Sequence, residues 1–163
     1  SSDLKGRNMF KLDEVKAHCD VPCGIYDTNR AIVAALSVVR MVDLINARME
    51  TEDAASAQGQ NDIARYINTK EEEAAVCKEE IRIIWGDFIK PVHVLDNPDI
   101  HTMVHNIMML GGAAKQHVSR EKAMDLLAAV NYFSELFWKL KGMESKRVTA
   151  PYAPGEEMVL PVI

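Results

Sequence analysis

The residues best suited to chemistry lie near the start of this 163-residue chain. Cys19 and Cys23 are four positions apart, and Pro22 and Gly24 make the stretch around them incompatible with a helix. Two thiols on such a tight turn can meet at one metal ion. They can equally remain free thiols or form a reversible disulfide, and the spacing alone favours neither kind of chemistry over the other.

His18 places nitrogen donors, an imidazole and a backbone amide, directly beside Cys19. Sulfur combined with nitrogen suits zinc, copper or nickel. A tetrahedral zinc site needs a fourth side-chain ligand, which the neighbouring sequence does not supply. Ligation by backbone nitrogen would instead favour square-planar Ni(II) or Cu(II).

The composition indicates what kind of domain must position this segment. The length predicts one domain, and 48% apolar with 26% charged residues is ordinary for a globular protein. Aromatic residues make up only 6% and there are nine methionines, which favours helices packed through aliphatic side chains over a sheet. The three cysteines cannot all pair, so they exclude a disulfide framework and suit a reducing compartment. We therefore expect a cytoplasmic protein, or a plastid one if the source is an alga.

Charge and hydropathy exclude two classes of partner. Lysine and arginine total 19 and aspartate and glutamate total 24, and 19 − 24 gives a net charge of −5. This sign gives no electrostatic basis for binding nucleic acid. No uncharged apolar run reaches the length of about 18 residues that a membrane span needs, so we expect no membrane partner either.

Four segments carry apolar residues at the spacings of three and four that are typical of amphipathic helices. Short connections between them predict an all-α four-helix bundle over residues 28–147. Gly111 and Gly112 lower the helix propensity of the third segment but permit close packing. The segments begin at Thr28, at Asn61 or Asp62, at the Asp96-Asn97-Pro98-Asp99 cluster and at Ser119, with Pro91 ending the second and Gly142 the fourth.

The two ends of the chain differ from the bundle. Residues 1–17 are charged throughout and lack the apolar segment of a secretion signal, so we interpret them as a leader or pro-segment. Residues 148–163 contain three prolines and are expected to form an extended C-terminal tail. Because Met158–Ile163 is too apolar to remain free in solution, we expect this tail to lie on a subunit surface or at an interface.

Residues 18–27 resemble the nickel-binding hook of the nickel superoxide dismutase family, whose pattern is H-C-x-x-P-C-G-x-Y. Trp85–Pro91 is similar to a second motif of that family and Phe137-Trp138 to its last-helix aromatic pair, so the resemblance spans about residues 18–141. It implies a homohexamer of four-helix-bundle subunits, each with one nickel ion, that converts superoxide to oxygen and peroxide. The matching hook residues are His18, Cys19, Asp20, Pro22, Cys23, Gly24, Tyr26 and Asp27.

The resemblance also implies a set of metal ligands. Cys19 and Cys23 would supply thiolates, and the main-chain nitrogen of Cys19 would bind in deprotonated form. The α-amine of His18 would complete a square, with its imidazole bound axially to the oxidised metal. In this family a maturation peptidase removes the leader. With residues 1–17 attached, the His18 nitrogen is an amide, so we expect the uncut chain to be inactive. The alternative is a non-catalytic bundle whose hook binds metal weakly or senses thiol oxidation.

Other positions would support the hook. Asp20 can accept hydrogen bonds from amides of the turn, and Pro22 stiffens it. Tyr26 would either order water and limit access beside the open face of the metal or anchor the hook on the bundle. Lys90 and Lys115 match family positions near the mouth of the site and would steer the superoxide anion, unless they serve only solubility.

Two departures from the family pattern affect the surroundings of the metal. Ala34 stands where some members carry a glutamate that supports the imidazole, and Phe88 stands where some carry a second tyrosine. Groups behind the ligands orient them, so these departures bear most on the axial role of His18.

The remaining metal-binding residue types favour ordinary roles. Cys77 lies on the apolar stripe of the second helical segment and is expected to be a small core residue. His101 and His105 are one helical turn apart, a spacing that can bind metal, but they have no cysteine or carboxylate partner. His93 and His117 are expected on the surface or in loops.

Overall fold

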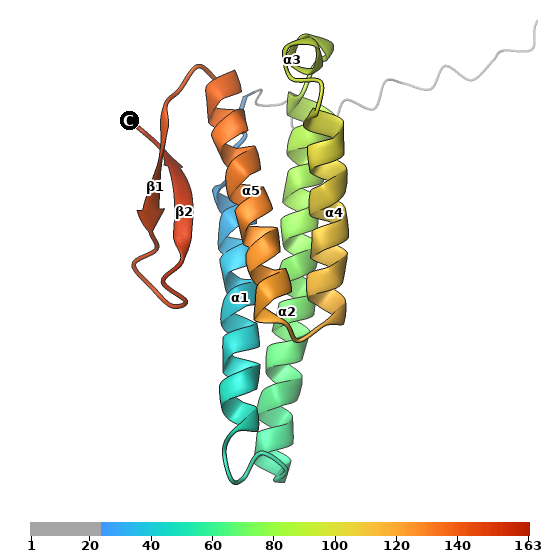
Figure 1. The fold of residues 1–163 in the computed structure, drawn as a ribbon, viewed down its shortest axis with the longest axis vertical. Coiled ribbons are helices and arrows are strands. Elements are labelled where there is room, and N and C mark those ends of the chain that lie inside the picture. The colour runs from blue at the N-terminus through green and yellow to red at the C-terminus, as the bar shows by residue number, and fades with distance from the viewer. Residues whose placement is uncertain (1–23) are drawn as a thin grey trace, which may run out of the picture.

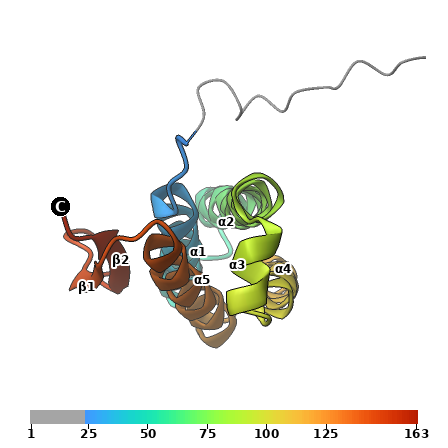
Figure 2. The same cartoon turned by 90° about the horizontal axis from the view of Figure 1, so that it is seen from above.

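The computed structural model describes residues 24–163, and they form the expected helical bundle (Figure 1). Its long helices are α1 (Asn29–Met49), α2 (Ala57–Ile83), α4 (Ile100–Gln116) and α5 (Arg120–Leu140). Contacts join α1 to α2, α2 to α4, α4 to α5 and α5 to α1, so the four helices surround one core (Figure 2). This confirms the four-helix bundle. No helix in this part of the chain is both long and apolar enough to cross a membrane.

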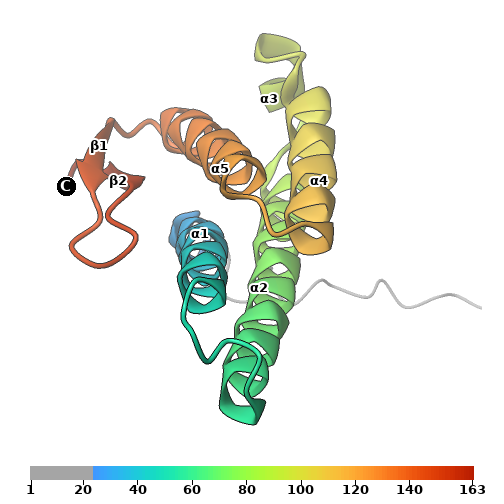
Figure 3. The ribbon, with the colours of Figure 1, turned by 60° about the horizontal axis from the view of Figure 1, so that its bottom comes forward.

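The apolar stripes read from the sequence point into this core. Ile32 and Leu36 of α1, and Phe133 and Phe137 of α5, are almost completely buried. Met49 is an exception, with 59% of its surface exposed. It is the last residue of α1, and at that end α1 and α2 extend beyond α4 and α5 (Figures 1 and 3).

Local interactions set the helix ends and one close contact. The Ser56 hydroxyl accepts a hydrogen bond from the Gly59 amide at 3.0 Å, and α2 therefore starts one turn earlier than expected. Ser119 caps α5 as predicted. A Cβ on Gly111 would lie 2.7 Å from the Cγ of Lys78 in α2, so this glycine does allow α2 and α4 to approach, whereas Gly112 faces open space.

The connection between α2 and α4 differs from the expected simple break at Pro91. After α2 the chain forms a short π-helix, η2 (Ile84–Phe88), and then α3 (Pro91–Asp96). Ile89 is extended, so the break falls there, and Pro91 occupies the first turn of α3, where its missing N–H costs nothing. These two elements form one end of the bundle, near the start of α1 and the end of α5 (Figure 1).

The C-terminal segment is a β-hairpin rather than an extended tail. Strands β1 (Ser145–Thr149) and β2 (Glu157–Pro161) pair antiparallel, with Val148 opposite Met158, so the tail predicted to begin at residue 148 starts within β1. The hairpin packs on α5 and α1, on the side away from α4 (Figures 1 and 2). Met158 and Val159 are buried there, which accounts for the apolar end of the sequence.

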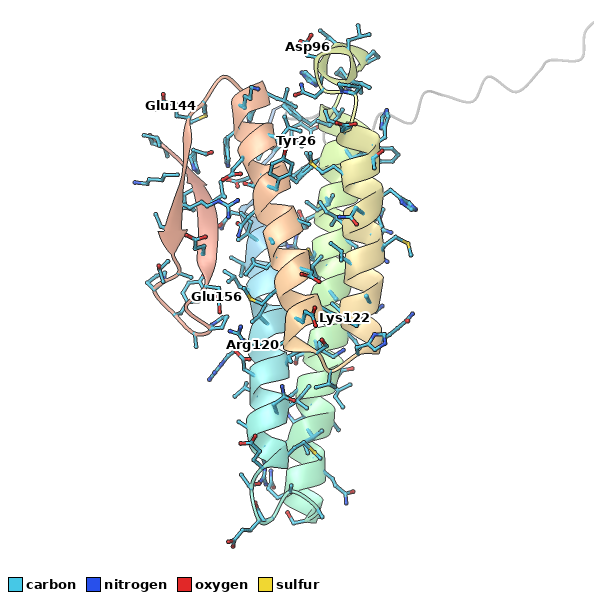
Figure 4. All side chains as sticks on the ribbon, in the orientation of Figure 1. Tyr26, Asp96, Arg120, Lys122, Glu144 and Glu156 are labelled. Atoms are coloured by element: carbon cyan, nitrogen blue, oxygen red, sulfur yellow. The ribbon has the colours of Figure 1, made fainter. Side chains whose placement is uncertain are left out.

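Polar side chains fasten the hairpin to the bundle. Arg120, at the start of α5, bonds to Glu156 of the hairpin at 2.6 Å and to Asp43 of α1 at 2.9 Å (Figure 4). Arg147 of β1 forms a two-pronged contact with Glu135 of α5, at 2.6 and 3.2 Å. The hairpin is therefore part of the folded domain.

Candidate functional site

The expected metal ligands precede the part of the chain that the structure describes. His18, Cys19, Asp20, Pro22 and Cys23 all lie outside residues 24–163. The structure does show Gly24 to Asp27, the end of the hook, and the surface to which they are attached. The structure therefore shows the surroundings of the expected site from Gly24, the residue after Cys23, onward.

The end of the hook is held in a defined path onto α1. Gly24 has a φ of +89°, a conformation that glycine adopts without strain, and its carbonyl accepts a hydrogen bond from the Tyr26 amide at 3.1 Å. The Asp27 carboxylate accepts a hydrogen bond from the Asn29 amide at 2.7 Å. The buried hydroxyls of Thr28 and Ser134 then hydrogen-bond to each other and tie the start of α1 to α5.

An aromatic cluster lies against this path. The ring of half-buried Tyr26 is 5.6 Å from that of Phe88 in η2. Phe88 in turn lies 5.0 Å from Phe137 of α5 and stacks on His93 of α3 at 5.4 Å. Phe137 meets Trp138 edge-on at 4.9 Å. Tyr26 thus packs at the end of the bundle that carries α3, an anchoring contact (Figure 4).

Lys141 completes the cluster and was not singled out from the sequence. Its Nζ lies 3.4 Å from the carbonyl oxygens of both Gly24 and Tyr26. The same ammonium is 5.4 Å from the ring centre of Phe137 and 5.8 Å from that of Trp138. The only sequence signal was its place four residues after Phe137, which puts both side chains on one helix face.

Lys90 lies at this same end of the bundle. It is exposed, follows Phe88 by two residues, and occupies the position just before α3. Its amide donates to Nδ1 of His93 at 3.0 Å, which fixes the backbone there. Lys90 also borders an apolar groove of about 540 Å³ that is lined in part by Trp85 and Leu95. Lys90 therefore lies at the end of the bundle that carries the aromatic cluster, and its steering role stays a prediction.

Lys115 lies near the C-terminal end of α4, whereas Lys90 precedes α3 and so lies near the N-terminal end of α4. Measured from His101, at the N-terminal end of α4, Lys115 is fourteen residues away, or about 21 Å along the helix at 1.5 Å per residue. Its ammonium is 3.7 Å from Glu71, and the buried ammonium of Lys70 donates to the Ala114 and Lys115 carbonyls. Burial lowers the pKa of Lys70. Within one chain, the length of α4 therefore separates Lys115 from the end of the bundle that carries Lys90, and the steering role of both lysines stays a prediction.

The other candidate ligands have ordinary environments. Cys77 is fully buried, as predicted, and burial raises the pKa of its thiol to about 12. Nδ1 of His101 accepts a hydrogen bond from Nε1 of Trp85 at 2.9 Å. Ala34 is buried in the core, so α1 presents no carboxylate at that position. Residues 24–163 contain no group of three or more His, Cys, Asp or Glu side chains that could hold a metal ion.

A metal site in this chain would therefore draw its ligands from His18, Cys19 and Cys23, whose sulfur and nitrogen donors suit nickel. The described surroundings fit such a site. The aromatic cluster provides a water-poor base, and the buried Nε1 of Trp138 has no hydrogen-bond partner within residues 24–163.

Comparisons with known proteins agree with this assignment. A family profile described as nickel-containing superoxide dismutase matches residues 13–141. The chain is 32% identical over 131 residues to a nickel superoxide dismutase of Streptomyces seoulensis, covering 78% of this chain and 91% of the relative. It is 31% identical over 130 residues to that of Streptomyces coelicolor, covering 78% and 90%. A native nickel superoxide dismutase structure superposes with a TM-score of 0.64 at 27% identity, covering 76% of this chain and 99% of the other.

Proposed function

Because the chain belongs to the family of nickel-containing superoxide dismutases, we propose that it dismutates superoxide with nickel held by the hook after residues 1–17 are removed. The observation that supports this most is the family match over residues 13–141, which includes an intact His18, Cys19 and Cys23. Nickel is the cofactor of the family. The homohexamer and the peptidase that removes the leader remain predictions.

The reaction converts two superoxide anions and two protons into one oxygen and one hydrogen peroxide molecule. When bound, nickel supplies a centre that takes an electron from one superoxide and gives an electron to the next. The side chains of the chain support this electron exchange in three ways. The Cys19 and Cys23 thiolates donate charge to the metal and stabilise its oxidised state. Tyr26 limits access to the metal at the edge of the aromatic cluster, and Lys90 attracts the anionic substrate.

The leader determines whether His18 can contribute its main-chain nitrogen. In the uncut chain this nitrogen is part of the Ala17–His18 peptide bond, and its lone pair is delocalised into the carbonyl of Ala17. Cleavage would convert it into an α-amine with a pKa of about 8, which a metal ion can deprotonate and bind at neutral pH. The uncut chain should therefore bind nickel poorly and turn over superoxide slowly.

Three forms of the protein test this proposal: the uncut chain, the chain cut between Ala17 and His18, and the cut chain with one extra alanine before His18. Nickel content and superoxide turnover are measured for each. We expect stoichiometric nickel and activity only in the second form, and neither when Cys19 or Cys23 of that form is replaced by serine. Full activity in the uncut chain would refute the amine mechanism. A cut chain that binds no nickel would instead support the non-catalytic alternative.

A further inference from the structure

We propose that the apolar groove beside α3 is a contact surface between two copies of this chain, which meet at the ends of their bundles that carry α3. This inference goes beyond the proposed function and does not depend on it, because it is built on residues 84–101 alone. Three features of this end of the molecule support it: an apolar hollow, a leucine at its edge, and opposite charges at the two ends of α3.

The groove lies between η2, α3 and the start of α4, where α3 lies across the end of the bundle (Figures 1 and 2). Its volume of about 540 Å³ is within the range of about 300–1,000 Å³ that is usual for binding pockets. Its walls include Trp85, Ile89, Val94 and Leu95. Trp85 is 40% exposed and Leu95 is 82% exposed. Large apolar side chains that gather on the surface in this way indicate a site of interaction.

Trp85 is already fixed in the position that such a contact needs. Its Nε1 donates a hydrogen bond to Nδ1 of His101 at 2.9 Å, and the two rings meet edge-on with their centres 5.8 Å apart. Because these contacts hold the indole against α4, little side-chain entropy is lost when a partner covers it. Tryptophan is also one of the residue types that contribute most to binding at protein interfaces.

The shape of this surface favours a second copy of the same chain as its occupant. Leu95 lines the groove but is 82% exposed, so a projection and a hollow lie side by side. Val92, one turn before Leu95 on α3, is 58% exposed and extends the apolar surface. In a twofold contact both copies use the same surface, and each places its projection in the hollow of the other. Leu95 of each copy would therefore enter the groove of the other copy and cover Trp85 there.

The charges at the ends of α3 support the same arrangement. Exposed Lys90 lies just before α3, and exposed Asp96 is its last residue. Figure 4 shows Asp96 at the outer end of the molecule. When two α3 helices pack antiparallel about a twofold axis, Lys90 of each copy lies beside Asp96 of the other. These exposed ion pairs would add little affinity, but they would fix the direction of the contact.

The mass of the full, uncut chain in solution tests this contact, measured by light scattering over a range of protein concentrations. We expect the wild type to self-associate. Leu95→Glu should weaken this association by about tenfold or more, because it places a charge in an apolar groove. Met109→Glu is the matched control, since Met109 is 62% exposed on α4 but does not line the groove, and its mass should equal that of the wild type. Circular dichroism checks that each variant keeps its helices.

A charge exchange tests the antiparallel arrangement. Lys90→Glu and Asp96→Lys should each weaken association, because each places like charges beside one another. The two changes combined in one chain should restore it, since the reversed pair can still form. A double variant that associates as weakly as the single variants would refute this arrangement.

Other results would overturn the inference as a whole. A wild type that stays monomeric at every concentration, both uncut and cut after Ala17, would show that the groove does not join two copies. If that monomer binds the apolar dye anilinonaphthalene sulfonate and Leu95→Glu does not, the groove takes a small apolar molecule instead. An oligomer whose mass is unchanged by Leu95→Glu, or is lowered equally by Met109→Glu, would place the contact elsewhere. Because these measurements use neither nickel nor superoxide, this inference and the proposed function can fail separately.

Discussion

Asn131 of α5 should be the main polar attachment of the C-terminal hairpin. Its side chain is 2% exposed, donates to the Glu157 carbonyl at 2.9 Å and accepts from the Val159 amide at 3.1 Å. The register explains this fit. Bonds between Ala150 and Glu156 and between Val162 and Glu144 make every second pair a hydrogen-bonded one, so Glu157 and Val159 point their main-chain groups outward, toward α5.

The cost of Asn131→Ala follows from the burial of these two groups. Val159 is 1% exposed, so its N–H loses its partner with no access to water, at a cost of about 2 kcal/mol. Glu157 is exposed, so water can replace the lost donor, and we assign about 1 kcal/mol to that bond. Together these predict a loss of about 3 kcal/mol in the free energy of unfolding. For a domain of this size that loss corresponds to a fall in Tm of about 6–12 °C.

Urea unfolding followed by circular dichroism measures this loss, and hydrogen exchange of the Val159 amide reports on the bond itself. Asn106→Ala is the matched control, because Asn106 is exposed on α4 and should change the stability by less than about 0.5 kcal/mol. A loss below about 1 kcal/mol in Asn131→Ala, or unchanged protection of the Val159 amide, would refute this account of how the hairpin is held.

Three other outcomes are expected. The Arg48 guanidinium lowers the pKa of Asp53 from 3.8 to about 2. The stability that this contact adds is therefore complete above pH 3.8 and is lost as the pH falls toward 2. Arg48→Met should remove this loss of stability in acid, as measured by urea unfolding at several pH values. Cys77→Ser should cost about 1–3 kcal/mol, because it buries a hydroxyl, and should leave nickel content and activity unchanged. Lys90→Met should lower kcat/KM by a factor that shrinks as salt is added, whereas an equal effect of Lys115→Met would contradict a steering role for Lys90 alone.

The bundle could be predicted because the buried residues of a helix recur in the sequence at a regular spacing. Ile32, Leu36 and Phe133, for example, recur with the helical period and are buried, although Met49 at the end of α1 is exposed. The short elements η2 and α3 lack such a spacing and were not predicted. Pro91 was interpreted as a stop signal, although a proline is equally suited to the first turn of a new helix, and only the extended backbone at Ile89 distinguishes the two cases.

The hairpin escaped prediction for a related reason. A two-stranded ribbon is recognised by strict alternation of buried and exposed residues, but Met158 and Val159 are neighbours and both are buried. β2 contacts both α5 and α1, a tertiary effect that a local pattern does not contain. The burial of the segment was foreseeable from its apolar residues, but its pairing was not.

The candidate site likewise contains a part that is local in sequence and could be predicted, and a part that depends on the fold and could not. The hook could be recognised because its donors stand within six consecutive positions, and their residue types alone indicate metal chemistry. Lys141 could not, because 117 residues separate it from Gly24 and only the antiparallel course of α1 and α5 brings them together. The family match, residues 13–141, runs from before the hook to this lysine, whereas the hairpin begins beyond it at Ser145. The matched region therefore contains both the expected ligands and the lysine that contacts Gly24, although the two lie at opposite ends of the matched sequence.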